Sequence, residues 1–187
     1  MQAVTQQTDQ PANELITTVR ALNEGNVSVK PAPEPKGRGV FARRAFREGE
    51  VVVAGIVEGI AKQRTNFSIQ LFWNVHANFE EPAVVINHSC GPNVAVVPNE
   101  LGAYSFVAVT AIDEGAEICF DYATTEYESI AVPECHCGAP QCRGKSGGYI
   151  LLPDEHELKM RGLVAPYLRD SRAGKVLDSV ITFREVA

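Results

Sequence analysis

The stretch Asn87-His88-Ser89-Cys90-Gly91-Pro92-Asn93 lies in the middle of the chain, between two apolar runs. The runs, 83–86 and 94–97, have the length and composition of buried strands. A connecting turn between strands needs only the Gly-Pro pair and an Asn. A turn does not require the imidazole of His88 or the thiol of Cys90. The stretch is therefore either a polar turn with one buried Cys or part of a chemical site.

A second chemical signal is the segment Cys135-His136-Cys137-Gly138-Ala139-Pro140-Gln141-Cys142-Arg143-Gly144. One residue separates its first two cysteines and four residues separate the second from the third. The Gly and Pro allow the tight turns that bring three thiols to one point. This spacing predicts a zinc site, and zinc takes four ligands in structural sites. A disulfide or a redox-active pair of thiols is the alternative.

The fourth zinc ligand has to come from elsewhere, because the side chain of His136 points away when both of its neighbours bind the metal. The candidates are Cys90, Cys119, His76, His88 and His156. Cys119 stands in an alternating strand, where an inert buried Cys is expected. Cys90 stands in a turn and is free to ligate. A site of four thiolates would be closed and therefore structural, its ligands being Cys90, Cys135, Cys137 and Cys142.

Composition excludes several classes of function. The 187 residues are 45% hydrophobic and 21% charged, as in an ordinary soluble domain, and the formal net charge is −6. No basic cluster exceeds Arg43-Arg44, so direct nucleic-acid binding is not expected, whereas an acidic surface suits a basic partner. No apolar run reaches about 18 residues and no signal peptide is evident, so neither membrane insertion nor secretion is expected. We expect the cytosol, or the nucleus if the source is eukaryotic; no oligomeric state is indicated.

Short β-like segments separated by turn residues predict a mainly β fold, a β-rich α+β domain of several small sheets. The segments are 40–42, 51–57, 67–72, 83–86, 94–97, 103–109 and 117–120. Residues 1–10 are expected to be disordered, and a short helix should follow, capped by Asn13 and ended by Gly25. Residues 154–170 predict a C-terminal helix bent by Gly162 and Pro166. No function is inferred for residues 171–187.

Four motifs occur in a fixed order along the chain. They are G-x-G-V-F-A from Gly37, N-H-S-C-x-P-N from Asn87, G-x-E-I-x-F-D-Y ending at Tyr122, and C-x-C followed by C-R-G from Cys135. Gly37-Arg38-Gly39 is weak alone, because it lacks the further glycine of a dinucleotide-binding loop. Together they resemble the SET-domain methyltransferases that carry a post-SET zinc segment, over roughly residues 27–148. The small stand-alone SET proteins of microbial type are the most similar.

The resemblance implies a fold and a set of roles. The segments 87–93 and 120–122 would thread into a pseudoknot, which is rare in proteins. The expected division is a tail and short helix at 1–26, a SET domain at 27–130, a post-SET zinc segment at 131–148, and a C-terminal helix and tail at 149–187. Tyr122 would be the active-site tyrosine and Phe120 the residue that sets the methylation degree, allowing di- or trimethylation. S-adenosylmethionine would contact Gly37, Arg38, Gly39, Asn87, His88, Tyr122 and His136, and zinc would bind Cys90, Cys135, Cys137 and Cys142.

The substrate side departs from the family pattern. No tyrosine precedes Tyr104, so the second aromatic wall of a lysine channel has to come from Phe67, Phe72 or Trp73, or is missing. There is also no cysteine-rich region before the domain. A protein-lysine methyltransferase is the main prediction, with histones among its candidate substrates. A SET-fold enzyme that methylates a small molecule is the alternative, and a non-catalytic domain that binds cofactor or proteins is the third interpretation.

Overall fold

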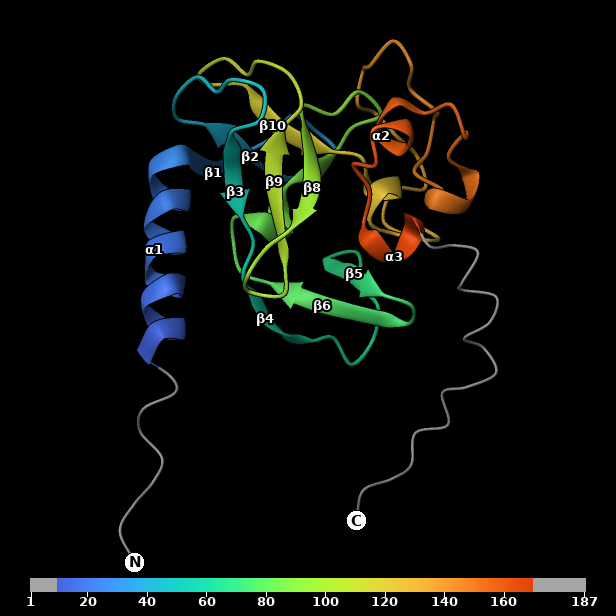
Figure 1. The fold of residues 1–187 in the computed structure, drawn as a ribbon. Coiled ribbons are helices and arrows are strands. Elements are labelled where there is room, and N and C mark those ends of the chain that lie inside the picture. The colour runs from blue at the N-terminus through green and yellow to red at the C-terminus, as the bar shows by residue number, and fades with distance from the viewer. Residues whose placement is uncertain (1–9, 170–187) are drawn as a thin grey trace, which may run out of the picture.

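The computed structural model describes residues 10–169, and residues 1–9 and 170–187 lie outside this range (Figure 1). Its helices and single 3₁₀ turns are α1 (Gln10–Asn26), η1 (Ala83–Val85), η2 (Tyr122–Thr124), η3 (Tyr149–Leu151), α2 (Glu157–Met160) and α3 (Pro166–Arg169). Its strands are β1 (Val27–Pro31), β2 (Arg38–Ala42), β3 (Val51–Ala54), β4 (Val57–Ile60), β5 (Ser68–Phe72), β6 (Val75–Phe79), β7 (Asn87–His88), β8 (Val94–Pro98), β9 (Tyr104–Ala108) and β10 (Glu117–Phe120). No helix among the described residues is both long and apolar enough to cross a membrane.

The strands form three small sheets, with the orders β1-β2-β10-β7, β3-β9-β8 and β4-β6-β5. Neighbouring strands are antiparallel except for β7 and β10, which run parallel. Figure 1 shows the sheet of β3, β9 and β8 in the centre of the molecule and the sheet of β4, β6 and β5 below it. The prediction of a β-rich fold built from several small sheets is confirmed.

The core lies between the sheets and is built mainly from β-branched residues. Val40, Val52, Val94 and Ile118 are almost completely buried, each on a different strand. Phe106 of β9 meets Phe120 of β10 edge to face, with the ring centroids 5.1 Å apart, which joins two sheets directly. Burial of each such side chain stabilises the fold by about 1.5–3 kcal/mol. The core therefore holds β10 in place, and the candidate site residue Tyr122 comes shortly after the end of this strand.

Helix α1 packs against β3, and two buried asparagines of the helix bond to the backbone of that strand. The side chain of Asn23 donates to the Ala54 carbonyl and accepts from the Ala54 amide, both at 2.9 Å. The amide of Asn26 donates to the carbonyls of Val51 and Val52 at 3.1 Å. These bonds satisfy the outer edge of β3, which would otherwise expose unpaired backbone groups.

Two predicted strands were wrong in detail. The apolar run 83–86 forms the 3₁₀ turn η1, because a run of four residues is too short to distinguish a strand from a buried turn. The segment 51–57 divides into β3 and β4 at Gly55, where a Cβ atom would lie 2.6 Å from the Tyr104 carbonyl oxygen. Strand β6 was not predicted, although Ala77 and Phe79 alternate with polar residues and are buried.

The two central motifs lie side by side, as the resemblance implied. In the parallel pair, Asn87–His88 of β7 lies opposite Cys119–Phe120 of β10. Asn93 closes the loop after β7, because its side-chain oxygen accepts the Cys119 amide at 2.9 Å and its side-chain nitrogen donates to the Glu117 carbonyl at 2.8 Å. Both ends of the stretch 87–93 are therefore attached to the same strand.

The C-terminal region differs from the single bent helix predicted at 154–170. Two one-turn helices, α2 and α3, are separated at Gly162, whose φ of 67° is left-handed and ends α2. His156 stands at the N-cap position of α2, without a hydrogen bond from its side chain to the helix. The buried Leu168 and Tyr167 attach α3 to the core, and Tyr167 donates a hydrogen bond to the carbonyl of Thr125.

Candidate active site and metal centre

Four thiols converge where the segment 135–142 folds against the turn that follows β7. The sulfurs of Cys90, Cys135, Cys137 and Cys142 all lie within 4.8 Å of one another, and those of Cys90 and Cys135 are 4.0 Å apart. Sulfurs around a tetrahedral zinc ion, with Zn–S bonds of about 2.3 Å, are about 3.8 Å apart. The donor set and its spacing therefore fit one zinc ion, while Cys119 lies outside the cluster and is buried.

His88 connects this cluster to the backbone of Tyr122. Its Nδ1 accepts the Tyr122 amide at 3.2 Å, and its Nε2 lies 3.4 Å from the sulfur of Cys90. Burial lowers the pKa of the His88 imidazole to about 4, so the ring is neutral at neutral pH. Because the accepting nitrogen carries no proton, Nε2 carries it and donates to the sulfur. The side chain of His88 is thus a link between the cysteine cluster and the strand end.

Asp121 is the most deeply buried charged residue of the site. Its Oδ1 accepts hydrogen bonds from the Arg143 guanidinium at 2.7 Å and from the Ala123 amide at 3.0 Å. Its Oδ2 lies 3.7 Å from Nε2 of His156, which precedes α2. The carboxylate therefore lies between β10, the cysteine segment and the C-terminal region, and it connects the three.

Tyr122 begins the 3₁₀ turn that follows β10. Its hydroxyl donates to the carbonyl of Ile86 at 2.9 Å, and its ring packs against Phe120 with the centroids 4.7 Å apart. Burial raises the pKa of the Tyr122 phenol well above its usual range. At neutral pH the phenol is therefore protonated and acts as a hydrogen-bond donor.

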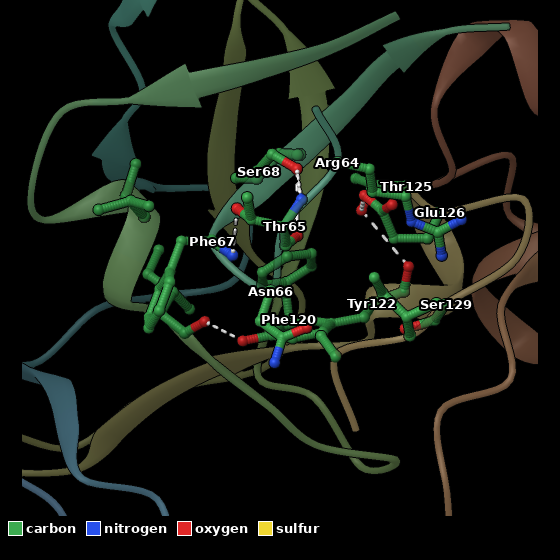
Figure 2. A pocket seen from close by; sticks show the side chains of 16 residues that line it. Arg64, Thr65, Asn66, Phe67, Ser68, Phe120, Tyr122, Thr125, Glu126 and Ser129 are labelled. Atoms are coloured by element: carbon green, nitrogen blue, oxygen red, sulfur yellow. Dashed lines mark hydrogen bonds between the residues drawn. The ribbon is translucent and has the colours of Figure 1, made fainter. Parts of the chain in front are cut away.

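A narrow cavity of about 20 Å³ opens on one side of Tyr122. Figure 2 shows the segment 64–68 facing Phe120 and Tyr122 across it. Its full lining comprises Arg64, Thr65, Asn66, Phe67, Ser68, Ile69, Ala83, Val84, Ile86, Phe120, Tyr122, Thr125, Glu126, Ser129, Ile130 and Ala131. We call this the channel cavity. Its volume is that of about one water molecule, so it admits only a slender group.

The lining of the channel cavity shows which aromatic residue forms its second aromatic wall. Phe67 lines it and is 66% exposed, so its ring stands at the surface beside the opening. Phe72 and Trp73 lie elsewhere, because both pack against Tyr167, at centroid distances of 6.1 Å and 5.2 Å. Of the three aromatic residues that the sequence left open, Phe67 is the one at the cavity.

A wider cavity, of about 260 Å³, opens on the other side of Tyr122, and its lining includes Lys36, Glu134 and two histidines. It is lined by Pro35, Lys36, Asn66, Phe67, Asn87, His88, Tyr122, Ala131, Val132, Pro133, Glu134, Cys135, His136 and Cys137. We call this the polar cavity. It shares Asn66, Phe67, Tyr122 and Ala131 with the channel cavity, so the two meet at Tyr122.

A hydrogen-bonded network forms one wall of the polar cavity. The amide nitrogen of Asn87 donates to the Arg38 carbonyl and to Oε1 of Glu117, each at 2.9 Å, which leaves its oxygen able to accept. Lys36 pairs with the other oxygen of Glu117 at 2.8 Å. Burial opposes the charge of Lys36, but this pair outweighs it and the pKa of Lys36 is raised.

Only some of the predicted cofactor-binding residues line this cavity. Asn87, His88, Tyr122 and His136 line it, whereas Gly37, Arg38 and Gly39 follow directly after the lining residues Pro35 and Lys36. A Cβ at Gly39 would lie 2.9 Å from the Asn87 side-chain nitrogen, so that glycine keeps room for the network. The guanidinium of Arg38 points to Glu81, 2.6 Å away, on the exposed surface.

Three site residues were missed by sequence reasoning. Lys36 directly precedes the glycine motif, and Asn66 stands in a segment considered only for its aromatic residues. Glu126 follows the last strand motif by four residues and is buried in the wall of the channel cavity. Nothing local distinguishes these residues, because strands from other parts of the chain create their surroundings.

Comparison with known proteins finds a matching family and several relatives. Residues 37–123 match the family described as SET domain. The chain is 30% identical over 162 residues to "Histone-lysine N-methyltransferase mes-4" of Caenorhabditis elegans, covering 68% of this chain and 18% of that protein. It is 41% identical over 66 residues to "Histone-lysine N-methyltransferase, H3 lysine-36 specific" of Mycosarcoma maydis, covering 34% of this chain and 7% of that protein. The chain thus spans less than a fifth of either relative.

A solved structure shows the same fold. It is described as "crystal structure of KRYPTONITE in complex with mCHG DNA and SAH" and superposes with a TM-score of 0.51 at 23% identity, covering 64% of this chain and 28% of that one. The chain contains a SET domain, at residues 37–123, in a region that it shares with histone-lysine methyltransferases. The predicted SET fold is therefore confirmed.

Proposed function

We propose that this protein transfers a methyl group from S-adenosylmethionine to the ε-amine of a lysine in a protein substrate. The observation that carries the proposal is the meeting of the polar cavity and the channel cavity at Tyr122. A donor in the wide cavity and a slender acceptor in the narrow one would approach each other at that residue. A direct displacement requires the attacking amine and the methyl donor to be held in line with each other.

The polar cavity has the chemistry that S-adenosylmethionine needs. Lys36, the free oxygen of Asn87 and the ring of His136 offer a cation, an acceptor and a flat surface around one space. Backbone groups of Gly37, Arg38 and Gly39 are proposed to continue this contact at the adjacent edge. When bound, the donor supplies an electrophilic methyl group on a positively charged sulfonium.

The acceptor amine has to be neutral and oriented. With a reference pKa of about 10.4, roughly one lysine in a thousand is neutral at pH 7. The apolar walls of the channel cavity, including Ile69, Val84 and Ile86, exclude water and favour the neutral form. Orientation in a fixed channel can supply about 7–11 kcal/mol of the barrier reduction.

Tyr122 is proposed to orient the reacting groups rather than to act as a base. Its phenol is neutral, and its hydrogen bond to Ile86 fixes the ring between the two cavities. Phe120 packs against Tyr122 and lines the channel cavity without adding a polar group. We propose that the space left by Phe120 permits di- and trimethylation.

The metal centre is proposed to hold the wall of the donor site. Cys135, His136 and Cys137 line the polar cavity, so a zinc ion on the four thiols would fix that wall against Cys90. Zinc with four thiolates has no open position and serves a structural role. The chemistry of the transfer would then belong to the residues around Tyr122.

The substrate is proposed to be a lysine-bearing protein or peptide, with histone tails as the first candidates because the relatives named above are histone-lysine methyltransferases. The net charge of −6 suits a basic partner of this kind. We place the reaction in the cytoplasm, or in the nucleus if the source is eukaryotic. A small-molecule acceptor is the competing substrate class in the experiment below.

The experiment is incubation of the protein with methyl-labelled S-adenosylmethionine and, separately, with core histones, a proteome extract and a small-molecule extract. Label in protein lysine supports the proposal, and label only in a metabolite contradicts the substrate class. Binding of the donor without transfer to any extract contradicts an enzymatic function. Tyr122→Phe should lower transfer strongly, whereas Tyr149→Phe, a buried tyrosine outside both cavities, should not.

A further inference from the structure

Glu126 contributes a carboxylate to the wall of the channel cavity. Among the described lining residues it is the only acidic one, and Arg64 is the only basic one. The side chain of Glu126 is 9% exposed, so the carboxylate lies inside the wall rather than at the opening. A buried carboxylate in the wall of a narrow cavity requires an explanation.

Three groups form hydrogen bonds with the carboxylate of Glu126. Its Oε1 accepts the Gln70 amide at 2.8 Å and lies 3.5 Å from the hydroxyl of Thr125. Its Oε2 lies 3.2 Å from Nε2 of His76, which β6 places beside it. These groups hold the carboxylate in one orientation.

The described residues place no lysine or arginine within ion-pair distance of Glu126. Arg64, the one cation in the lining, directs its guanidinium to the carbonyl of Glu128 instead. Its one ionisable partner among the described residues is His76, and a positively charged ligand in the cavity would supply a further countercharge to this buried carboxylate. The channel cavity is therefore prepared for a cation.

We propose that Glu126 recognises the protonated amine of the acceptor side chain as it enters the channel cavity. This inference rests on the proposed function and names the chemical class of the acceptor: a primary or methylated ammonium on an extended aliphatic stem. The apolar residues Ile69, Val84 and Ile86 suit the stem, and Glu126 suits the charge. His76 is a positioning residue that acts through Glu126.

The role of Glu126 is recognition, because a nearby anion favours the charged form of an amine, whereas transfer requires the neutral form. The positive sulfonium of a donor in the polar cavity opposes the effect of Glu126. The acceptor would thus be selected as a cation and would lose its proton once both cavities are filled. A neutral side chain of the same length would be rejected at the first step.

Two small probes test this selection without requiring methyl transfer. N-acetyl-lysine methylamide and N-acetyl-norleucine methylamide differ at the end of the side chain, which is charged in the first and apolar in the second. The backbone amide of Gln70 donates to Glu126, so its NMR resonance reports directly on the carboxylate. We expect the lysine probe to shift this resonance and to bind at least about tenfold more tightly than the norleucine probe.

Glu126→Gln keeps the shape of the side chain and removes its charge. In this variant the preference for the lysine probe should fall to about twofold or less. Glu128→Gln, the same change at an exposed position two residues away, should keep the full preference. Thermal unfolding of both variants shows whether either substitution disturbs the fold; if Glu126→Gln is unfolded, the titration of the wild-type Gln70 resonance still decides the question.

Equal binding of the two probes by the wild-type protein would overturn the inference, as would a Gln70 resonance that neither probe moves. An undiminished lysine preference in Glu126→Gln would also overturn it. These outcomes are separate from those of the proposed function: a protein that methylates lysine but lacks the charge preference contradicts only the role of Glu126. A protein with the preference but no transfer activity contradicts only the proposed activity.

Discussion

The guanidinium of Arg143 donates a hydrogen bond to the fully buried carboxylate of Asp121 across 2.7 Å, and this contact joins the cysteine segment to the residue that precedes Tyr122. Asp121 is 0% exposed and Arg143 is 23% exposed at their side chains. The pair lies beside the metal centre without belonging to its thiol set. It therefore couples the position of the cysteine segment to that of the proposed active-site tyrosine.

Arg143→Ala should destabilise the protein substantially, because it leaves a buried carboxylate without its cation. Breaking a buried ion pair in this way costs about 3–5 kcal/mol, which corresponds to a fall of about 10 °C in the unfolding temperature. The matched control is Arg38→Ala, whose exposed pair with Glu81 contributes about 0–1 kcal/mol. Thermal unfolding of the two variants measures both; equal losses would contradict the importance of the buried contact.

Removal of the metal should lower both stability and methyl transfer. Four thiolates without zinc repel one another, and the segment 135–142 would no longer be held against Cys90. Metal analysis should find one zinc ion per chain in the untreated protein and in Cys119→Ala, and less in Cys137→Ser. A metal-free preparation with full activity would show that the thiols serve another purpose.

Phe120→Tyr should lower the degree of methylation. The added hydroxyl would occupy space in a channel cavity of only about 20 Å³ and would compete for room with methyl groups already on the amine. Mass spectrometry of the product should therefore show a shift from di- and trimethyl-lysine towards monomethyl-lysine. Phe72→Tyr is the matched control, since Phe72 packs against Tyr167 away from the cavity. An unchanged product distribution in Phe120→Tyr would refute the assignment.

Acid should destabilise the C-terminal region through His156. Burial lowers the pKa of its imidazole, while the charge of Asp121 works in the opposite direction; Arg143 and Lys159 lower it further and Glu157 raises it. In the unfolded chain His156 takes up a proton near pH 6.5, whereas in the folded protein it does so only at a lower pH. The stability that is present above pH 6.5 is therefore lost as the pH falls towards the pKa of His156 in the folded protein. His156→Gln should thus lose less stability than the wild type between about pH 7.5 and about pH 5.5. Parallel denaturation curves with equal losses would contradict this.

The clustering of the four thiols was largely predictable from the sequence, because three of them are distinctive residues with short spacings. Three thiols within eight residues limit where the metal can lie, and Cys90 in a turn was the favoured fourth ligand. The order of the four motifs likewise predicted the fold and the pairing of 87–93 with the strand that ends at Phe120. Local chemistry carried these predictions.

The substrate side was not predictable in the same way. Phe67, Phe72 and Trp73 are close in sequence, and only the turn before β5 decides that Phe67 reaches the cavity while the other two pack on Tyr167. Glu126 belongs to no sequence motif, and its burial results from contacts with β5 and β6, which are distant in sequence. The surroundings of Phe67 and Glu126 are created by segments that are distant in sequence, so the spacing of residues within one segment does not predict them.

A crystal structure of the protein with S-adenosylhomocysteine and zinc tests the proposed site most directly. The ligand should occupy the polar cavity between Lys36 and His136, with its sulfur beside Tyr122 and directed into the channel cavity. A ligand bound elsewhere, or one whose sulfur points away from Tyr122, would contradict methyl transfer through this site.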